Sequence, residues 1–258
     1  MRNVLTIAGR ELRSIFVSPI AYVVMTGFLL LGGWFFFNLL ARFNLLVSMY
    51  SSFQGGGEAM ARLNVNEFVL APLLHNLSVV LVILVPMITM RSFAEEKRSG
   101  TYELLLTSPI AIWEIVLGKF LGTSVFITVM VGLTAIYGAI LAVYGNPELG
   151  IMLGGYLGLW LLALTFVAIG MFASSLTENQ IIAAVTGLVM MLLLFVVGWA
   201  ADTAGETVGA ILRYVSVTEH SGELIRGVID TKTLIYFASM IAGWMFLTQR
   251  SVESVRWR

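Results

Sequence analysis

The sequence predicts an all-α, polytopic membrane protein that forms a single domain over residues 1–258 and contains six transmembrane helices. The first observation is composition: the chain is 59% hydrophobic and only 12% charged, whereas soluble domains carry about 25% charged residues. The second is that the apolar residues gather in long runs separated by short polar segments. A helix needs about 20 mostly apolar residues to cross the hydrocarbon core, and these runs approach or exceed that length. The formal net charge is zero, which gives no argument for a nucleic-acid partner.

Five runs are long enough to span a membrane without extension, and a sixth is short but can be extended through Thr231 and Thr248. The runs are Ile20–Leu40, Leu70–Met90, Phe120–Tyr144, Ile151–Ala173, Ile181–Ala201 and Leu234–Leu247. The first follows a basic N-terminus, but it is too long for the apolar region of a signal peptide, so we expect it to be retained.

The distribution of basic residues predicts that both chain termini are cytoplasmic. With six spans in that orientation, ten basic residues lie inside and five outside, in the sense of the positive-inside rule. The inner ones are Arg2, Arg10, Arg13, Arg91, Lys97, Arg98, Lys119, Arg250, Arg256 and Arg258; the outer ones are Arg42, Arg62, Arg213, Arg226 and Lys232.

Residues 1–19 are predicted to form an amphipathic helix that lies in the membrane interface. Its apolar residues share one helical face, and Ser18-Pro19 should break the chain before the first span. A frayed terminus is the alternative. The expected apolar face consists of Val4, Leu5, Ala8, Leu12, Ile15 and Phe16.

The chain lacks the common signatures of enzymes. It has no P-loop, no His-Glu-x-x-His, no Gly-x-Ser-x-Gly, no cysteine and only two histidines, so we expect no catalytic site, no metal site and no bound cofactor. The predicted span interiors hold no ionisable residue, which counts against a proton- or sodium-coupled carrier. If the protein moves a cargo, the energy should come from a partner.

Two polar residues stand out near the outer end of the second span, His75 and Asn76. They could line a transport path or contact cargo, but hydrogen bonding between helices is the simpler interpretation. Two small-residue pairs, Gly118-x-x-x-Gly122 and Gly154-x-x-x-Gly158, predict close helix packing, without assigning a dimer seam.

Charged residues concentrate in the cytoplasmic region 91–114, between the second and third spans. We expect a short helix pair in which Gly100 ends the first helix in a left-handed conformation and Thr101 caps the second. Leu104–Leu106 would give the second helix an apolar patch, and Pro109 would stop it. An exposed element of this kind suits docking to a partner protein, although a solvated loop is the favoured interpretation of a bare charge run.

Residues 201–231 are too polar to span the membrane. Their apolar residues recur at near-helical spacing, which predicts two short amphipathic outer helices, re-entrant or interfacial, broken at Glu219–Gly222. They could form a lid, contact an extracytoplasmic partner, or simply lie in the interface.

The segment Glu95–Pro109 reads Glu-Glu-Lys-Arg-x-Gly-Thr-x-Glu-x-Leu-Leu-x-x-Pro and resembles the cytoplasmic loop of ABC type-2 transporter permeases. The likeness extends over nearly the whole chain, through the N-terminal helix, Ser18-Pro19 and the outer segment before the last span. Phe93–Pro109 and Arg226–Asp230 are most similar to the GldF-like subgroup, named for a gliding-motility permease.

The resemblance implies a permease subunit of an ATP-driven ABC exporter in the bacterial inner membrane. Such permeases pair as homodimers or heterodimers, and separate ATPase subunits bind the ATP and Mg²⁺. A GldG-like protein with a large extracytoplasmic domain usually accompanies GldF-like permeases. The residues that would couple to the ATPase are Glu95, Glu96, Lys97, Arg98, Gly100, Thr101 and Glu103.

A second hypothesis is an ATP-driven mechanical or signalling scaffold that acts on an extracytoplasmic partner and moves no cargo. The scarcity of polar groups in the spans is compatible with it, because a hydrophilic cargo would need a wetted path. The sequence does not identify a cargo, and it leaves homodimer and heterodimer equally open.

Overall fold

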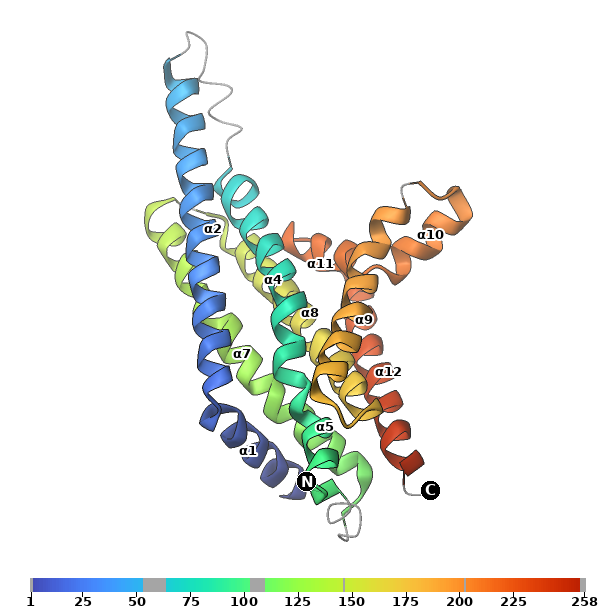
Figure 1. Cartoon of the computed structure of the whole chain (residues 1–258). Coiled ribbons are helices and arrows are strands. Elements are labelled where there is room, and N and C mark those ends of the chain that lie inside the picture. Colours follow the sequence, from blue (N-terminus) through green and yellow to red (C-terminus); the bar gives the residue numbers. More distant parts are fainter. Residues whose placement is uncertain (1, 53–63, 103–109, 146, 202, 256–258) are drawn as a thin grey trace.

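The computed structural model describes residues 2–52, 64–102, 110–145, 147–201 and 203–255, and these residues form helices joined by short connections, without a strand. Figure 1 shows long helices side by side, with α1, α5 and the last turn of α12 at one end and α10 and α11 at the other. We call these the α5 end and the α11 end. In chain order the helices are α1 Arg2–Val17, α2 Pro19–Ser52, the π-helix η1 Asn66–Leu70, α4 Ala71–Thr89, α5 Arg91–Arg98, α7 Ile112–Tyr144, α8 Leu149–Leu176, α9 Gln180–Ala201, α10 Glu206–Val215, α11 Val217–Ile225 and α12 Thr231–Val255.

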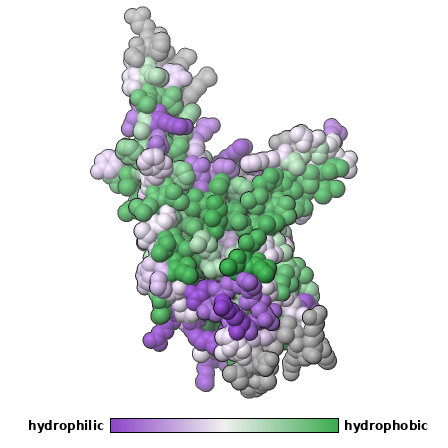
Figure 2. Space-filling model, viewed as in Figure 1, coloured by the Kyte–Doolittle hydropathy of each residue, from purple (hydrophilic) through white to green (hydrophobic). Residues whose placement is uncertain are grey.

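Five helical segments in the described residues are long and apolar enough to cross a membrane. They contain the first five predicted runs: Pro19–Ser51, Asn66–Arg98, Ile112–Tyr144, Leu149–Leu176 and Gln180–Ala201. The sixth predicted run lies in α12, whose 25 residues are enough to span but whose composition is less apolar. Figure 2 shows an apolar belt across the middle of the molecule, with hydrophilic residues gathered toward both ends.

The helices extend further than the apolar runs. The first span continues beyond Leu40 to the end of α2, and α7 begins eight residues before the predicted start at Phe120. The observed helix α7 therefore includes Glu114 and Lys119, two charged residues that precede the predicted span Phe120–Tyr144. Hydropathy marks the segment in contact with lipid, whereas backbone hydrogen bonding continues into the polar ends.

The predicted N-terminal helix and its break are both present. Helix α1 ends at Val17 and α2 begins at Pro19, a residue that fits the first helical position because it needs no N–H donor there. The buried face of α1 differs from the predicted one: Ile7 is buried, whereas Leu5 is 69% exposed. The face is set by packing against α7, which selects Val4 and Ile7 instead of following hydrophobicity alone.

A short amphipathic helix of the same chain packs against each of the two small-residue pairs. A Cβ added at Gly118 would lie 2.7 Å from the Ile7 side chain, and one at Gly122 would lie 2.7 Å from the Ala8 carbonyl oxygen, so this pair seats α1. On α8, a Cβ at Gly158 would lie 2.8 Å from Leu224, so the second pair seats α11. Close helix packing is confirmed, and its partners lie within the subunit.

The two short helices predicted within residues 201–231 are present, but the predicted break is wrong. Helices α10 and α11 meet at Ser216, whereas Glu219–Gly222 lies inside α11. Ser216 is fully buried and extended, and its side-chain oxygen accepts a hydrogen bond from the Glu219 backbone at 3.4 Å. A buried serine that caps α11 therefore fixes the break, which the polar residues in the sequence did not reveal.

Candidate functional site

Helix α5 is the short charged helix predicted after the second span, and it is anchored by a residue of α8. Ser174 lies on α8, and its side-chain oxygen accepts from the backbone N–H groups of Phe93 and Ala94 at 3.0 and 3.1 Å while donating to the Met90 carbonyl at 2.9 Å. First-turn N–H groups have no partner within their own helix. Ser174 therefore acts as the N-cap that α5 lacks in its own sequence.

Replacing Ser174 with alanine should lower the free energy of unfolding by about 1–2 kcal/mol, because two buried N–H groups lose their acceptor. Thermal unfolding of the purified protein in detergent would measure this. Ser254→Ala is a suitable control, since that serine is exposed and bonds only within its own helix. Equal stability of the two variants would contradict the capping role.

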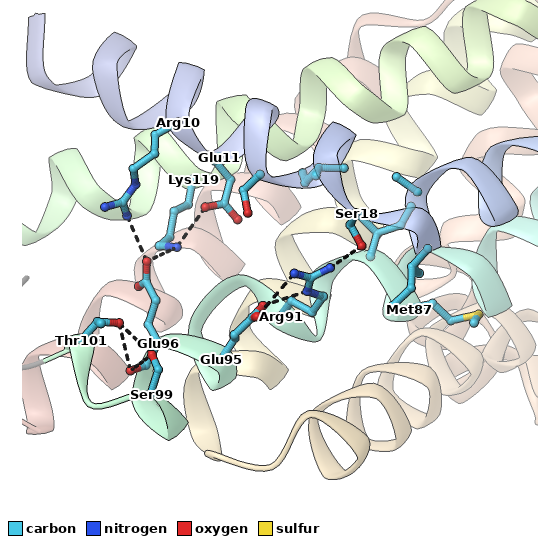
Figure 3. Close-up of a pocket in the computed structure, with 15 residues that line it drawn as sticks. Arg10, Glu11, Ser18, Met87, Arg91, Glu95, Glu96, Ser99, Thr101 and Lys119 are labelled. Atoms are coloured by element: carbon cyan, nitrogen blue, oxygen red, sulfur yellow. Dashed lines mark hydrogen bonds and ion pairs between the residues drawn. The ribbon is translucent and has the colours of Figure 1, made fainter.

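A buried lysine joins α5 to two other helices. Lys119 is 1% exposed, and its ammonium nitrogen lies 3.1 Å from a Glu11 oxygen of α1, 2.9 Å from a Glu96 oxygen of α5 and 2.7 Å from the Ser92 carbonyl (Figure 3). Three acceptors match the three N–H donors of an ammonium group. Arg10 reaches the same Glu96 oxygen at 3.0 Å. We call these four side chains, Arg10, Glu11, Glu96 and Lys119, the Lys119 cluster.

The Lys119 cluster is balanced in charge, and all of its members except Arg10, whose side chain is 57% exposed, are largely withdrawn from solvent. It holds two cations and two carboxylates, and the side chains of Glu11 and Glu96 are 13% and 17% exposed. Lys119 also lies 5.3 Å from the centre of the Phe93 ring. Removing one member of such a buried set is costly, because its partner keeps a charge that water no longer solvates.

A hydrogen bond from Arg91 ties α5 to the turn between α1 and α2. Arg91 contacts Glu95 at 2.8 Å and donates to the Ser18 side-chain oxygen at 2.6 Å. Between this pair and the Lys119 cluster lies a cavity of about 280 Å³, which Met87 and Ile88 close on the α4 side (Figure 3). The turn at Ser18 and the start of α5 are thus held together.

The far end of α5 approaches α8 and α12. Lys97 donates to the Ser175 carbonyl at 2.5 Å and lies over the Tyr102 ring, 5.3 Å from its centre. Tyr102 is buried and donates to the Val252 carbonyl at 3.4 Å. Burial, followed by the nearby Glu96 charge, raises the pKa of the Tyr102 phenol to about 12, so the group stays protonated at physiological pH.

The predicted coupling residues divide into two groups. Glu95, Glu96 and Lys97 are half-buried and bonded within the subunit, whereas Arg98, Gly100 and Thr101 are exposed. Gly100 has a φ of +71°, the left-handed conformation predicted for it. Thr101 bonds back toward α5, to Ser99 and the Glu96 carbonyl, and the N–H groups that it is predicted to cap lie outside the described residues. Glu103, Leu104–Leu106 and Pro109 lie outside the described residues.

Sequence reasoning missed the residues that hold α5. Glu11, Lys119 and Ser174 lie on three other helices and belong to no charge run. Two features of the sequence could have indicated them. Glu11 is an acidic residue on the apolar side of α1, and Lys119 stands at the start of an apolar run. A charge in such a position needs a partner when it is buried.

The other two singled-out residues lie elsewhere. His75 is exposed near the start of α4, where it borders a cavity and lies 6.2 Å from Phe195, ring centre to ring centre. Asn76 is half-buried beside it. About four helical turns separate these two residues from α5, and no contact among the described residues joins them to the Lys119 cluster.

Among the described residues, no group of three histidine or acidic side chains could hold a metal ion. At the α5 end, the exposed residues Arg98–Thr101 follow a short helix that ion pairs and a cap hold against α1, α7 and α8.

Comparison with known proteins gives a family but no close curated relative. No curated protein matches the chain. A family model described as ABC-2 family transporter protein matches residues 5–247. That match extends from α1 to α12 and includes every element of the site. The chain therefore belongs to the ABC-2 transporter family, whose members are membrane components of ABC transporters that work with a separate ATPase.

Proposed function

We propose that the chain is the permease subunit of an ATP-driven exporter in the bacterial inner membrane, pushed at α5 by a separate ATPase. The supporting observation is that α5 combines an exposed tip with a fixed base. Arg98–Thr101 is exposed, while Ser174, Lys119 and Arg91 bind the same helix to α8, α7 and the α1–α2 turn. Movement of α5 would carry those helices with it, because their contacts are short and directional.

In this proposal ATP and Mg²⁺ bind to the ATPase and not to this chain. Two permease copies, identical or homologous, form the membrane unit, and both termini face the ATPase. The position of α1, α5 and the end of α12 at one end of the molecule supports that orientation (Figure 1). A GldG-like partner would act at the α11 end, where α10 carries exposed apolar residues such as Ile211 and Tyr214.

Arg98→Glu should reduce stimulation of the partner ATPase by about tenfold or more, because charge reversal at a docking surface places like charges together. The unfolding temperature should not change, since Arg98 is exposed and makes no ion pair among the described residues. ATPase activity of the reconstituted complex in liposomes measures the first, and thermal unfolding measures the second.

Lys232→Glu is the matched control, because it reverses an exposed charge at the α11 end. Equal ATPase stimulation by Arg98→Glu and wild type would contradict the docking role of α5. In the same liposomes, ATP turnover without flux of any lipid or glycolipid would favour the mechanical scaffold over the exporter.

A further inference from the structure

A second cavity lies at the α11 end, where η1 and α4 meet α8 and α11. Its volume is about 690 Å³. Polar and apolar side chains both contribute to its lining: Asn66, Glu67, His75, Ile151, Ile225 and Arg226. It is distinct from the Lys119 cluster, which lies at the opposite end of α4 (Figure 1).

Asn66 lines this cavity and has a buried acceptor that no group among the described residues satisfies. The residue is 2% exposed, and its amide nitrogen donates to the Glu148 carbonyl at 3.4 Å. That bond fixes which amide atom is the oxygen, because a carbonyl can only accept. The amide oxygen is left without a partner. A buried carbonyl of this kind is stabilised by a ligand that brings an N–H or O–H donor.

The backbone at Asn66 is also unusual. Asn66–Leu70 is a π-helix, and the Ala71 N–H bonds to the Asn66 carbonyl. A π-helical turn inserts an extra residue into a helix and is frequent at functional sites. Here it places Asn66 and Glu67 next to each other at the cavity.

The cavity has fixed charges of both signs. Glu67 and Arg226 are exposed, and in the part of the chain that the structure describes neither makes an ion pair. An arginine presents paired N–H donors that suit a phosphate, and a carboxylate attracts an ammonium group. Ile151 and Ile225 add apolar surface to the same cavity, and the apolar belt adjoins this end of the molecule (Figure 2).

We propose that this cavity binds a phosphoethanolamine headgroup. Its ammonium group contacts Glu67 and the Asn66 oxygen, and its phosphate contacts Arg226. An ethanolamine headgroup supplies an N–H donor, a cation and a phosphate together. A choline headgroup has no N–H or O–H donor for Asn66, and a glycerol headgroup has no cation for Glu67. His75 borders the same space and can donate to the phosphate.

The test measures binding of short-chain phospholipids to the purified full chain in detergent, by titration calorimetry without any ATPase. Dihexanoyl phosphatidylethanolamine should bind about tenfold more tightly than the phosphatidylcholine and phosphatidylglycerol equivalents. Arg226→Gln and Glu67→Gln should each weaken ethanolamine-lipid binding about tenfold. Asn66→Leu should do the same, and its ligand-free unfolding temperature shows whether it is folded.

Lys232→Gln and Glu206→Gln are the matched controls, since each neutralises an exposed charge outside this cavity. Equal binding of the ethanolamine and choline lipids by wild type would overturn the proposal. So would unchanged ethanolamine-lipid binding by both Arg226→Gln and Glu67→Gln, which keep the fold because both residues are exposed. Failure of ATPase coupling would leave these measurements unaffected, so this proposal and the proposed function can fail separately.

Binding of soluble O-phosphoethanolamine, measured in the same way, distinguishes a bilayer lipid from another carrier of the same headgroup. Weaker binding than the diacyl lipid would support a bilayer lipid as the ligand. Equal binding would support the headgroup chemistry and indicate a carrier other than the bilayer.

Discussion

Glu96→Lys should lower the free energy of unfolding by about 3–5 kcal/mol, the range found when one partner of a buried ion pair is removed. The substitution places a third cation beside Lys119 and Arg10, which lie 2.9 and 3.0 Å from the present carboxylate. Lys119 is 1% exposed and cannot turn to water. Loss of Glu96 should also weaken the hold of α7 on α5, since Lys119 would keep only the Ser92 carbonyl there, so that ATPase coupling falls together with stability.

The neighbouring acidic residue provides the control for this experiment. Glu95 has a side chain that is 46% exposed and pairs with Arg91 within the same helix. Exposed pairs of this type contribute about 0.3–0.5 kcal/mol, so Glu95→Lys should change the free energy of unfolding by less than about 1 kcal/mol. Thermal unfolding in detergent compares the two. Equal stability of Glu95→Lys and Glu96→Lys would contradict a stabilising ion pair between Lys119 and Glu96.

Gly122→Leu should lower the free energy of unfolding by about 3 kcal/mol, because it separates α1 from α7. Even a Cβ at this position would lie 2.7 Å from the Ala8 carbonyl oxygen and 2.8 Å from the Glu11 side chain. Overpacking of a close contact costs about 1–3 kcal/mol, and here the backbone of α1 would have to move. The movement would also withdraw Glu11 from Lys119.

Gly132→Leu on the same helix is the control, since a Cβ there would meet nothing within 4 Å. It should be neutral or slightly stabilising, because leucine favours a helix more than glycine by about 1 kcal/mol. Limited proteolysis after Arg10 or Arg13 would report detachment of α1. Equal protection of that site in both variants would argue against the role of Gly122 in seating α1.

The assembly around α5 was only partly predictable from the sequence. The helix itself, its end at Gly100 and the break at Ser18-Pro19 depend on local rules and are confirmed. The sequence alone treated Glu95 and Glu96 as equivalent coupling residues. In the fold, Glu95 is half-exposed, whereas Glu96 pairs with the buried Lys119.

The connection between α10 and α11 shows the same limit. The spacing of apolar residues correctly predicted two short helices, but not the break between them. The break lies at Ser216 because that residue is buried and caps α11, and burial is a property of the neighbouring helices. A polar stretch such as Glu219–Gly222 can equally lie on the outer face of a helix, as it does here.

The sequence by itself determined the membrane class, the order of the helices and the positions of the glycine pairs, because hydropathy, periodicity and small-residue spacing act within a few turns of one chain segment. Only the tertiary structure decided that Gly118 and Gly122 receive α1, that Lys119 bridges Glu11 and Glu96, and that Ser174 caps α5. Lys119 and Glu96 are 23 positions apart, and the other contacts join residues about 80 to 110 positions apart. Their specificity comes from close packing and from the need to pair each buried charge and N–H group, and a linear pattern does not encode either requirement.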